Sequence, residues 1–547
     1  MYIGRRQVLK GIGATLGALS LRGYVLAKEA AAHFTHGVAS GDPLADRVII
    51  WTRVLPGDGA ERSISCRWEV AIEPGFKELI ASGYQSARPE KDFTIKVDVL
   101  GLQPNQRYHY RFIAAGESSQ IGRTSTLPVG ELSEFKLGVA SCSNYPQGLF
   151  HAYREMAKAD LDIILHLGDY LYEYPVGYYV NPIAELELGR KVVPEHELVV
   201  LDDYRQRYGL YRSDPDLQVA HAAHPWITVW DDHEFTNDTW RLGAENHNEG
   251  EGDFAARREA ARVAYHEWMP IRTSENGDQG DIYRTFEIGN LADLIMLDTR
   301  QLGRDEQLDY GKDIDGAGGI DLFLKNKLNA SDRQLLGTKQ EEWLADQLVA
   351  SYERGTTWQV LGQQVLMGKL SFPSIPAEDL ENLILSKDVK SVIDRSNKLA
   401  PFGLPSNLDA WDGYPSARER LFKMLLASSS NPISLAGDTH NGWAFNLATD
   451  TGEAVGVEFG TPGITSPGLE TYLPIPPEKM LSILKEASSE LRYADTSKRG
   501  WTKVILTPEY ATAQWQFVSS VIDTQYSTSV GAELKTLAGS RRLIGSS

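Results

Sequence analysis

Apolar and polar residues alternate in short runs across the first part of the chain. The alternating runs cover residues 47–54, 65–72, 93–99 and 107–115, and Gly, Pro and Asn turns separate them. A period of two predicts β-strands, because successive side chains of a strand point to opposite faces of its sheet. We therefore expect residues 34–130 to form an all-β N-terminal domain.

One segment of this region is more specific than the others. In "VLGLQPNQRYHYRF", a leucine and a Pro-Asn turn precede alternating tyrosines that enter a strand. This order resembles the tyrosine corner of immunoglobulin-like and fibronectin type III sandwiches, so a β-sandwich of that kind is expected. The region holds no cluster of His, Asp and Cys. Packing or contact with a partner is the role that we expect for it.

From residue 134 the pattern changes to strands that alternate with helical stretches. Apolar runs that predict buried strands lie at residues 161–166, 226–230, 291–298 and 432–437. Apolar residues at helical spacing lie at 148–160, 338–355 and 417–429. This alternation predicts a sheet that helices flank on its faces. We expect an α/β domain over residues 134–547, whose C-terminal extension adds strands near 501–507 and 511–521.

The sequence of the first 27 residues predicts an export signal, which is not part of the fold. Arg5 and Arg6 precede a short, weakly apolar stretch, and "VLA" at 25–27 fits a cleavage site. The arginine pair favours export of the folded protein by the twin-arginine machinery, with a general secretory signal as the alternative. A periplasmic or secreted location follows. No later stretch is apolar and long enough for a membrane helix, so we expect no integral membrane segment in the mature chain.

Charge and composition narrow the classes of function. The 547 residues include 55 basic and 74 acidic ones, which gives a formal charge of −19. This balance argues against a nucleic-acid-binding surface and against general attachment to anionic membranes. With 42% apolar residues, the chain can build sizeable cores and is not expected to be disordered.

Polar side chains with metal-ligand chemistry follow the predicted strands of the α/β domain. Residues of this kind are Cys142, Asp169, Tyr172, Asp231 to Asn237, Arg300, Asp438 and His440. Taken singly, an Asp before a turn is usually a cap, and a Cys after a strand is usually a small buried apolar residue. Open α/β sheets, however, place their ligand sites at the carboxyl ends of strands. The set as a whole therefore predicts a metal site.

Other α/β chemistries lack their sequence patterns here. "ASCSNYPQG" after the first strand is not a dinucleotide-binding G-x-G-x-x-G turn, and neither a Walker sequence nor a G-x-S-x-G elbow is present. Hydrolysis at a metal centre is the chemistry that remains.

Five segments carry a family resemblance. "ASCSNYPQGLFHAY", "HLGDYLYEY", "WDDHEFTND", "LDTRQL" and "LAGDTHNGWAF" resemble, in order and spacing, the motifs of the alkaline phosphatase D (PhoD-like) family. The segment "GVASGDPLADRVIIWTRV" resembles the start of that family's N-terminal domain. The match runs from residue 34 to about 470. The family belongs to the calcineurin-like metallophosphoesterases, and it departs from their general pattern by having Cys where most begin with D-x-H.

The resemblance implies an iron site with four side chains. Asp169 matches the carboxylate that bridges two metals, and Tyr172 matches a tyrosinate bound to ferric iron. Cys142 would supply a thiolate and His440 an imidazole to the same iron. Thiolate, tyrosinate and carboxylate together bring up to three negative charges, which suits a trivalent ion better than a divalent one.

The resemblance also implies a second metal, calcium, beside the iron. Asp232 stands where the superfamily has the Asn of G-N-H-E, and adjacent Asp231 is the alternative ligand. Asp438 and Asn237 are expected on the same side. Carboxylate and amide oxygens are the hard ligands that calcium prefers, so the chemistry of these side chains agrees.

Two residues are expected to act on the substrate itself. His233, in the G-N-H-E position, would protonate or hydrogen-bond the leaving alkoxide. Arg300 would contact the substrate phosphate with its guanidinium fork, with a pairing at the protein surface as the alternative. The segment 301–350 is expected to help roof the site.

The expected function is a secreted, metal-dependent phosphoric ester hydrolase acting on phosphate mono- and diesters. Its substrates would be small phosphate esters or phospholipids. Alternatives are a phosphodiesterase or phospholipase D-like activity at the same site, a secreted binding protein without catalysis, and metal storage. The only cysteines are Cys66 and Cys142. We expect no disulfide between them, because they belong to strands of different domains and a bridge needs Cα atoms within about 7 Å.

Overall fold

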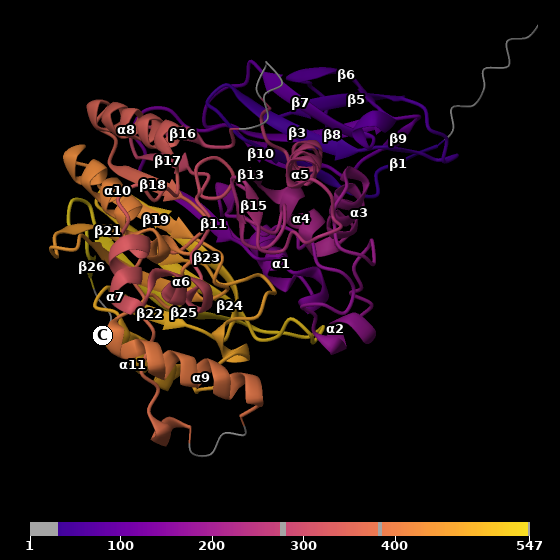
Figure 1. Ribbon diagram of the computed structural model, residues 1–547. Coiled ribbons are helices and arrows are strands. Elements are labelled where there is room, and N and C mark those ends of the chain that lie inside the picture. The colour runs from indigo at the N-terminus through magenta and orange to yellow at the C-terminus, as the bar shows by residue number, and fades with distance from the viewer. Residues whose placement is uncertain (1–30, 274–280, 381–384, 545–547) are drawn as a thin grey trace, which may run out of the picture.

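The computed structural model describes residues 31–273, 281–380 and 385–544. The predicted export signal at 1–27 lies outside these residues. The predicted alternation of strands and helices is confirmed, and it produces two large sheets with helices on their outer faces (Figure 1).

The larger sheet has ten strands, and its centre is parallel. In that centre β12 (Ile163–His166) lies between β11 (Phe135–Ala140) and β13 (Pro225–Thr228). All four residues of β12 and of β13 are buried, as expected for parallel strands covered on both faces. On one side the sheet continues with β23 (Arg499–Leu506), β24 (Tyr510–Val518), β25 (Thr528–Leu537) and β26 (Leu543–Ile544). On the other side it continues with β2 (Val38–Gly41), β3 (Arg47–Arg53) and β7 (Thr94–Leu100).

The second sheet has seven strands. Its order is β16 (Arg284–Ile288), β17 (Ala292–Met296), β18 (Trp358–Gly362), β19 (Pro432–Ala436), β21 (Ala454–Gly460), β20 (Gly442–Ala448) and β22 (Leu491–Asp495). The four strands from β17 to β21 are parallel, and the remaining pairs are antiparallel. The strand predicted near 501–507 is β23 of the other sheet, so the C-terminal segment completes the ten-stranded sheet as expected.

One continuous core joins the two sheets. It contains Leu137 and Ile164 from the larger sheet together with Leu294, Val360 and Leu435 from the smaller one. The larger sheet is covered by α1 (His151–Lys158), α3 (Leu201–Arg212), α4 (Pro215–Ala223) and α5 (Phe254–Trp268). The smaller sheet is covered by α8 (Thr338–Glu353), α10 (Pro415–Ala427) and α11 (Pro477–Ala487). None of the helices in the described part of the chain is long and apolar enough to cross a membrane.

The N-terminal strands form two facing sheets. β10 (Gly122–Ser125), β8 (Arg107–Ala114), β5 (Ile64–Ala71) and β6 (Ala81–Ala87) make a separate sheet, and short β9 (Glu117–Ser118) pairs with β8. Its inner residues share a core with β2, β3 and β7. The Tyr108 hydroxyl accepts a hydrogen bond from the backbone N–H of Gln103 at 2.8 Å, the kind of contact that a tyrosine corner makes. Membership of the immunoglobulin or fibronectin III class stays a prediction.

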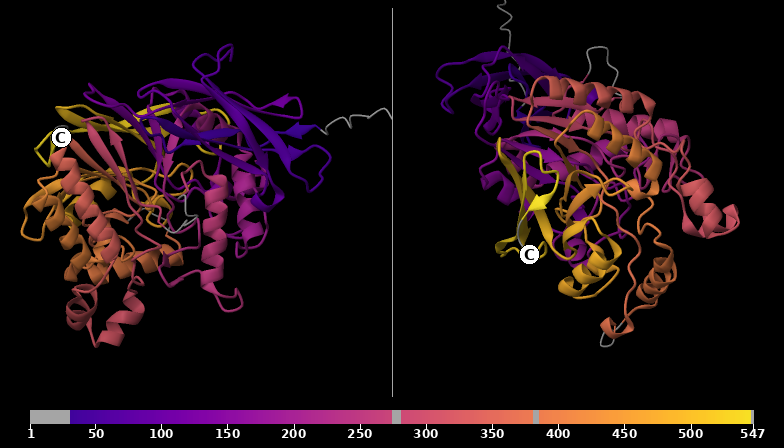
Figure 2. Two further views of the ribbon diagram at one scale, coloured as in Figure 1. Left: turned by 90° about the horizontal axis from the view of Figure 1, so that it is seen from above. Right: turned by 90° about the vertical axis from the view of Figure 1, so that its left-hand side faces the viewer.

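The ten-stranded sheet runs across the predicted domain boundary near residue 130. β2 pairs in parallel with β13, at Pro225–Ser40 and Trp226–Gly41. In Figures 1 and 2, the indigo N-terminal strands and the yellow C-terminal strands therefore lie toward opposite ends of one sheet. Asp42, which is fully buried, strengthens the junction, because its carboxylate accepts from the Arg272 N–H and from the Arg284 guanidinium, both at 2.7 Å.

A smaller group of helices has an apolar cluster of its own, although Ile393, in the last of these helices, also packs in the core of the smaller sheet. It includes α6 (Tyr310–Ala317), α7 (Ile320–Phe323), the π-helical turn Leu324–Leu328 and α9 (Lys387–Leu399). Short elements elsewhere are β1 (Ala32–His33), β4 (Leu55–Pro56), α2 (Pro182–Leu186), β14 (Thr239–Trp240) and β15 (Gly243–Ala244).

Candidate metal centre

The candidate site lies at the carboxyl ends of strands from both sheets. Cys142 follows β11, Asp169 follows β12, and Asp438 and His440 follow β19. These four residues have positive φ angles of 59°, 55°, 62° and 63°, respectively. The left-handed conformation is strained for residues with a Cβ, and such strain clusters at sites where the surrounding structure fixes a side chain for function. The loops are bent so that these four side chains leave the sheets at one rim.

The four side chains predicted for iron lie together. One donor atom each of Cys142, Asp169 and His440 lies within 4.8 Å of the other two. The Tyr172 hydroxyl donates to Asp169 Oδ2 at 3.1 Å and lies 3.3 Å from His440 Nε2. Thiol, carboxyl, imidazole and phenol groups are thus gathered at one point, where they could hold a single ion.

A second group of donors consists of carboxylates. Oxygens of Asp231, Asp232 and Asp438 also lie within 4.8 Å of one another. The sequence left open whether Asp231 or Asp232 points inward, and both do. Asp232 also belongs to a group with Asp169 and His233 that meets the same distance limit, so the two donor sets are contiguous. This arrangement could hold two neighbouring cations.

Each donor group contains a buried carboxylate oxygen without a partner. Asp169 Oδ1 and Asp231 Oδ2 have no hydrogen-bond partner among the described residues. Such orphaned oxygens are rare, because an unpaired buried acceptor loses its hydration without compensation. A cation at each position would provide the missing interaction, so the donor sets fit metal ions.

The pKa values of three of these carboxyl groups are raised, as expected where buried carboxylates lack positive charge. Burial raises the pKa of Asp169 and Asp231 well above the ordinary aspartate value, and nearby Asp232 adds to the rise in both. Burial, together with the neighbouring Asp409, raises the pKa of Asp438 to about 7. A metal ion among these groups would favour their charged forms and reverse these shifts.

Arg300 lies among the carboxylates rather than at the protein surface. Its side chain is fully buried, with Nε 2.5 Å from Asp231 Oδ1, Nη1 2.8 Å from Asp409 and Nη2 3.1 Å from Asp438 Oδ1. The surface-pairing alternative is therefore wrong. The expected contact with a substrate phosphate stays a prediction; in the structure all three guanidinium nitrogens have carboxylate partners. Arg300 instead provides a fixed positive charge beside Asp231 and Asp438.

Glu234, which was not singled out as functional from the sequence, holds two ligand loops together. Its Oε2 accepts from the backbone N–H groups of Asp169 at 3.0 Å and Asp231 at 2.8 Å, and its Oε1 accepts from that of Tyr170 at 2.6 Å. The side chain is fully buried. It fixes the spacing between the loops after β12 and β13, and so between the two donor groups.

Glu173, also missed in the sequence, orients His233. Its carboxylate lies 2.7 Å from His233 Nδ1 and accepts from the backbone N–H of Asn237, also at 2.7 Å. Burial disfavours the charged imidazole, but the Glu173 and Asp232 carboxylates outweigh it and raise the pKa of His233 well above its usual value. The signal in the sequence was its place in "GDYLYEY", four residues after Asp169.

Asn237, which was predicted to bind the second metal, lies in the lining of the cavity beside the donor groups. It is half-buried, and its side-chain Nδ2 donates to Glu245 at 3.1 Å. Its role as a metal ligand stays a prediction.

The chain's two cysteines are both free and buried, as predicted. Cys66 belongs to the core of the N-terminal sheets, whereas Cys142 belongs to the donor group. Burial, followed by the neighbouring Asp169 carboxylate, raises the pKa of the Cys142 thiol. A nearby cation is what would make its thiolate form accessible.

The donors open into a cavity of about 340 Å³. It is lined by Asp169, Tyr174, Tyr178, Tyr179, Asp232, His233, Asn237, Asp238, Asp438, His440 and Tyr472. No residue of 301–350 lines it in the described structure, so the expected contribution of that segment is not found, and four tyrosines line the cavity instead.

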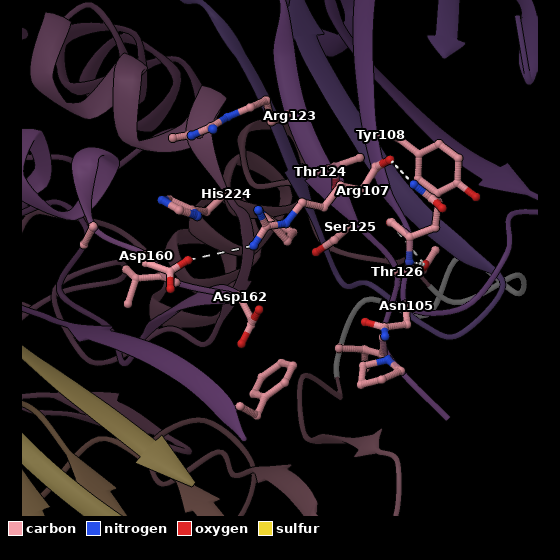
Figure 3. A pocket seen from close by; sticks show the side chains of 18 of the residues that line it. Asn105, Arg107, Tyr108, Arg123, Thr124, Ser125, Thr126, Asp160, Asp162 and His224 are labelled. Atoms are coloured by element: carbon pink, nitrogen blue, oxygen red, sulfur yellow. Dashed lines mark hydrogen bonds and ion pairs between the residues drawn. The ribbon is translucent and has the colours of Figure 1, made fainter. Parts of the chain in front are cut away.

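A larger cavity of about 740 Å³ lies elsewhere, between the N-terminal strands and the amino ends of β12 and β13. Figure 3 shows it, with Arg107 directed toward Asp160 and with Asp162 and His224 on the same side. The ligand loops are at the opposite edge of the sheet, so this cavity is separate from the donor groups.

Comparisons with known proteins agree over nearly the whole chain. The family model described as PhoD-like phosphatase matches residues 137–515, and that of the PhoD-like phosphatase N-terminal domain matches residues 20–128. Alkaline phosphatase D of Bacillus subtilis (strain 168) is 34% identical over 560 residues, which cover 98% of this chain and 86% of that protein. The solved structure described as "Structure of PhoD" superimposes with a TM-score of 0.77 at 32% identity, covering 93% of this chain and 91% of the other.

The contacts of Arg300 predict its effect on stability. In the presence of a chelator, Arg300→Met should lower the free energy of unfolding by about 3–5 kcal/mol, because it leaves buried carboxylates without their counter-charge. Urea denaturation measures this difference. Arg62→Met is the control: that arginine is half exposed and pairs with Asp58 at the surface, so a change below about 1 kcal/mol is expected.

The Arg300→Met variant should lose less stability at acidic pH than at alkaline pH. A carboxyl whose folded-state pKa is raised binds its proton more tightly when folded, so protonation stabilises the fold as pH falls through that pKa. Because the Arg300 charge lowers the pKa of Asp438, the loss in Arg300→Met should shrink as pH falls toward the parent's Asp438 pKa of about 7 and be smallest below it. Equal stability of Arg300→Met and the parent at all pH values would contradict the counter-charge role.

Proposed function

The chain belongs to the PhoD-like phosphatase family and is a phosphoric ester hydrolase; we propose that it is a secreted, metal-dependent alkaline phosphatase that cleaves both phosphate monoesters and diesters. The observation that carries the proposal is the pair of contiguous donor groups at one rim, each with an orphaned carboxylate oxygen. A non-catalytic binding protein would have no need for so complete a set of donors, and a storage site would not require an open cavity beside them.

We propose ferric iron and calcium as the metals. Cys142, Asp169, Tyr172 and His440 would hold iron, since sulfur, phenol and imidazole donors suit a transition metal. Asp231, Asp232 and Asp438 offer only oxygen, which suits calcium. When bound, such ions supply positive charge opposite the phosphoryl oxygens and make water more acidic.

His233 is proposed as the general acid. Glu173 engages Nδ1 and leaves Nε2 for the substrate, and the ring lines the cavity. The nearby carboxylates keep the imidazole charged, so it holds a proton that it can give to the departing alkoxide. Glu173 is a positioning residue in this scheme, and Arg300 keeps Asp231 and Asp438 in place.

Export is also part of the proposal. The twin-arginine pattern at Arg5 and Arg6 supports transport of a protein that is already folded, with its metals inserted before export. A cluster of buried donors on four separate loops is complete only in the folded chain, which is consistent with that order of events.

Asp169→Ala tests the metal centre. The variant should lose more than about a hundredfold in activity and bind less metal, because Asp169 belongs to the donor group with Cys142 and His440 and also to the group that connects it to Asp232. Hydrolysis of mono- and diesters and elemental analysis are the measurements. Asp160→Ala is a matched control, since Asp160 precedes the same strand at its opposite end and is mostly exposed. Near-normal activity of purified Asp169→Ala would refute the proposed site.

His233→Ala tests the general acid. Alkyl phosphates should slow by about a hundredfold or more and aryl phosphates far less, because a poor leaving group depends most on protonation. Steady-state rates for both classes give the comparison. His196→Ala, at a histidine 68% exposed and paired with Asp203, should leave both rates unchanged. Equal loss for both classes would instead make His233 a metal ligand or a packing residue.

Tyr172→Phe tests the iron assignment. A tyrosinate on ferric iron should colour the purified protein by charge transfer, so the visible band should vanish in Tyr172→Phe and shift in Cys142→Ser. The absorption spectrum measures this. Tyr153→Phe removes another buried hydroxyl, which contacts Ser143 and His166 instead of the donor group, and should keep the colour. A colourless, fully active parent protein would exclude the tyrosinate.

A further inference from the structure

We call the four aspartates that line the metal cavity, Asp169, Asp232, Asp238 and Asp438, its acidic floor, and the four tyrosines its wall. Tyr174, Tyr178, Tyr179 and Tyr472 account for four of the eleven lining residues, and the lining contains no lysine or arginine within the described residues. A wall without cations does not favour a second anionic group on the substrate. It favours an uncharged group with an apolar face.

Two of these tyrosines are unusually exposed. Tyr178 is 58% exposed and Tyr472 is 50% exposed. They come from distant segments, the loop between β12 and α2 and the turn after Leu469–Thr471, and both line the same cavity. Paired exposed aromatic rings beside a catalytic cavity are typical of a surface that a ligand covers.

The Tyr178 ring is held in place from below. Its centroid lies 4.7 Å from that of Tyr174, and the Tyr174 ring packs edge-on against His233 at 5.2 Å. The neighbouring Tyr179 carbonyl accepts from Asn144 Nδ2 at 3.0 Å and from Gln147 Nε2 at 2.9 Å. The loop is thus tied to the residues that follow Cys142, so little ordering is required when a ligand binds.

The position of His233 indicates which part of the substrate meets these rings. A general acid must lie within hydrogen-bond reach of the leaving oxygen. The alcohol attached to that oxygen then extends from His233 along Tyr174 toward Tyr178 and Tyr472. The phosphoryl group stays at the acidic floor.

We infer that Tyr178 and Tyr472 bind the alcohol part of the substrate, and that this alcohol carries an uncharged ring, either aryl or sugar. The inference rests on the proposed function, because it uses His233 as the acid. Both ring types present a flat or nearly flat apolar face to tyrosine, whereas glycerol does not.

The test compares substrates with and without a ring. In Tyr178→Ala/Tyr472→Ala, the ratio of kcat/KM for phenyl phosphate or glucose 1-phosphate to that for glycerol 1-phosphate should fall about tenfold, mainly through KM. Tyr178→Phe/Tyr472→Phe keeps the rings and should keep the ratio. Tyr84→Ala is the surface control, since that tyrosine on β6 is 72% exposed and does not line the cavity.

Each possible result of this comparison leads to a different conclusion. A fall confined to phenyl phosphate assigns an aryl alcohol, and a fall confined to glucose 1-phosphate assigns a sugar. An unchanged ratio in the double alanine variant, with all three esters still cleaved, overturns the inference and leaves the proposed function intact. A parent protein that cleaves no phosphate ester overturns the proposed function and the inference with it.

Discussion

The site depends on the crowding of buried negative charge at one rim. Arg300 brings one positive charge to Asp231, Asp232, Asp409 and Asp438, within 3.5 Å or less of each. Buried Arg304 also pairs with Asp409, but two cations still cannot neutralise four carboxylates in a medium of low dielectric constant. The remaining charge must be met by protons or by metal ions. The same deficit would weaken the metal-free fold and provide the affinity for metals, so one electrostatic constraint would link stability to metal binding.

Holding such a cluster together requires supports that do not themselves bind metal. Glu234 joins the loops after β12 and β13 through three backbone N–H groups, and Glu173 joins His233 to the backbone of Asn237. Both carboxylates are fully buried. Because backbone contacts fix the loops, the donor side chains can repel one another without moving apart. Positive φ angles at Cys142 and Asp169 are tolerated for the same reason.

The local pattern of apolar and polar residues predicted the strands and most of the candidate metal ligands. It did not predict interactions whose two residues lie far apart along the chain. Asp169 and Asp438 were predictable because each directly follows an apolar strand. The role of Arg300 as a buried counter-charge was not predictable, since it depends on Asp409, more than a hundred residues later, in a segment without a distinctive pattern. The parallel pairing of β2 with β13 is equally long-range. In "WDDHE", three acidic residues look alike, and only the fold shows that Glu234 turns to the backbone.

The floor and the wall of the cavity are constrained to different degrees. Floor residues are tied to one another, and Tyr179 shares in this, since its hydroxyl lies 3.3 Å from His440 Nδ1. Tyr178 and Tyr472 are half-exposed and stand outside the donor groups. A substitution at either position changes the surface that the alcohol meets and leaves the charges that act on phosphorus in place. Selectivity for the alcohol can therefore change in this fold without rebuilding the metal centre, whereas a change at Tyr179 would disturb both.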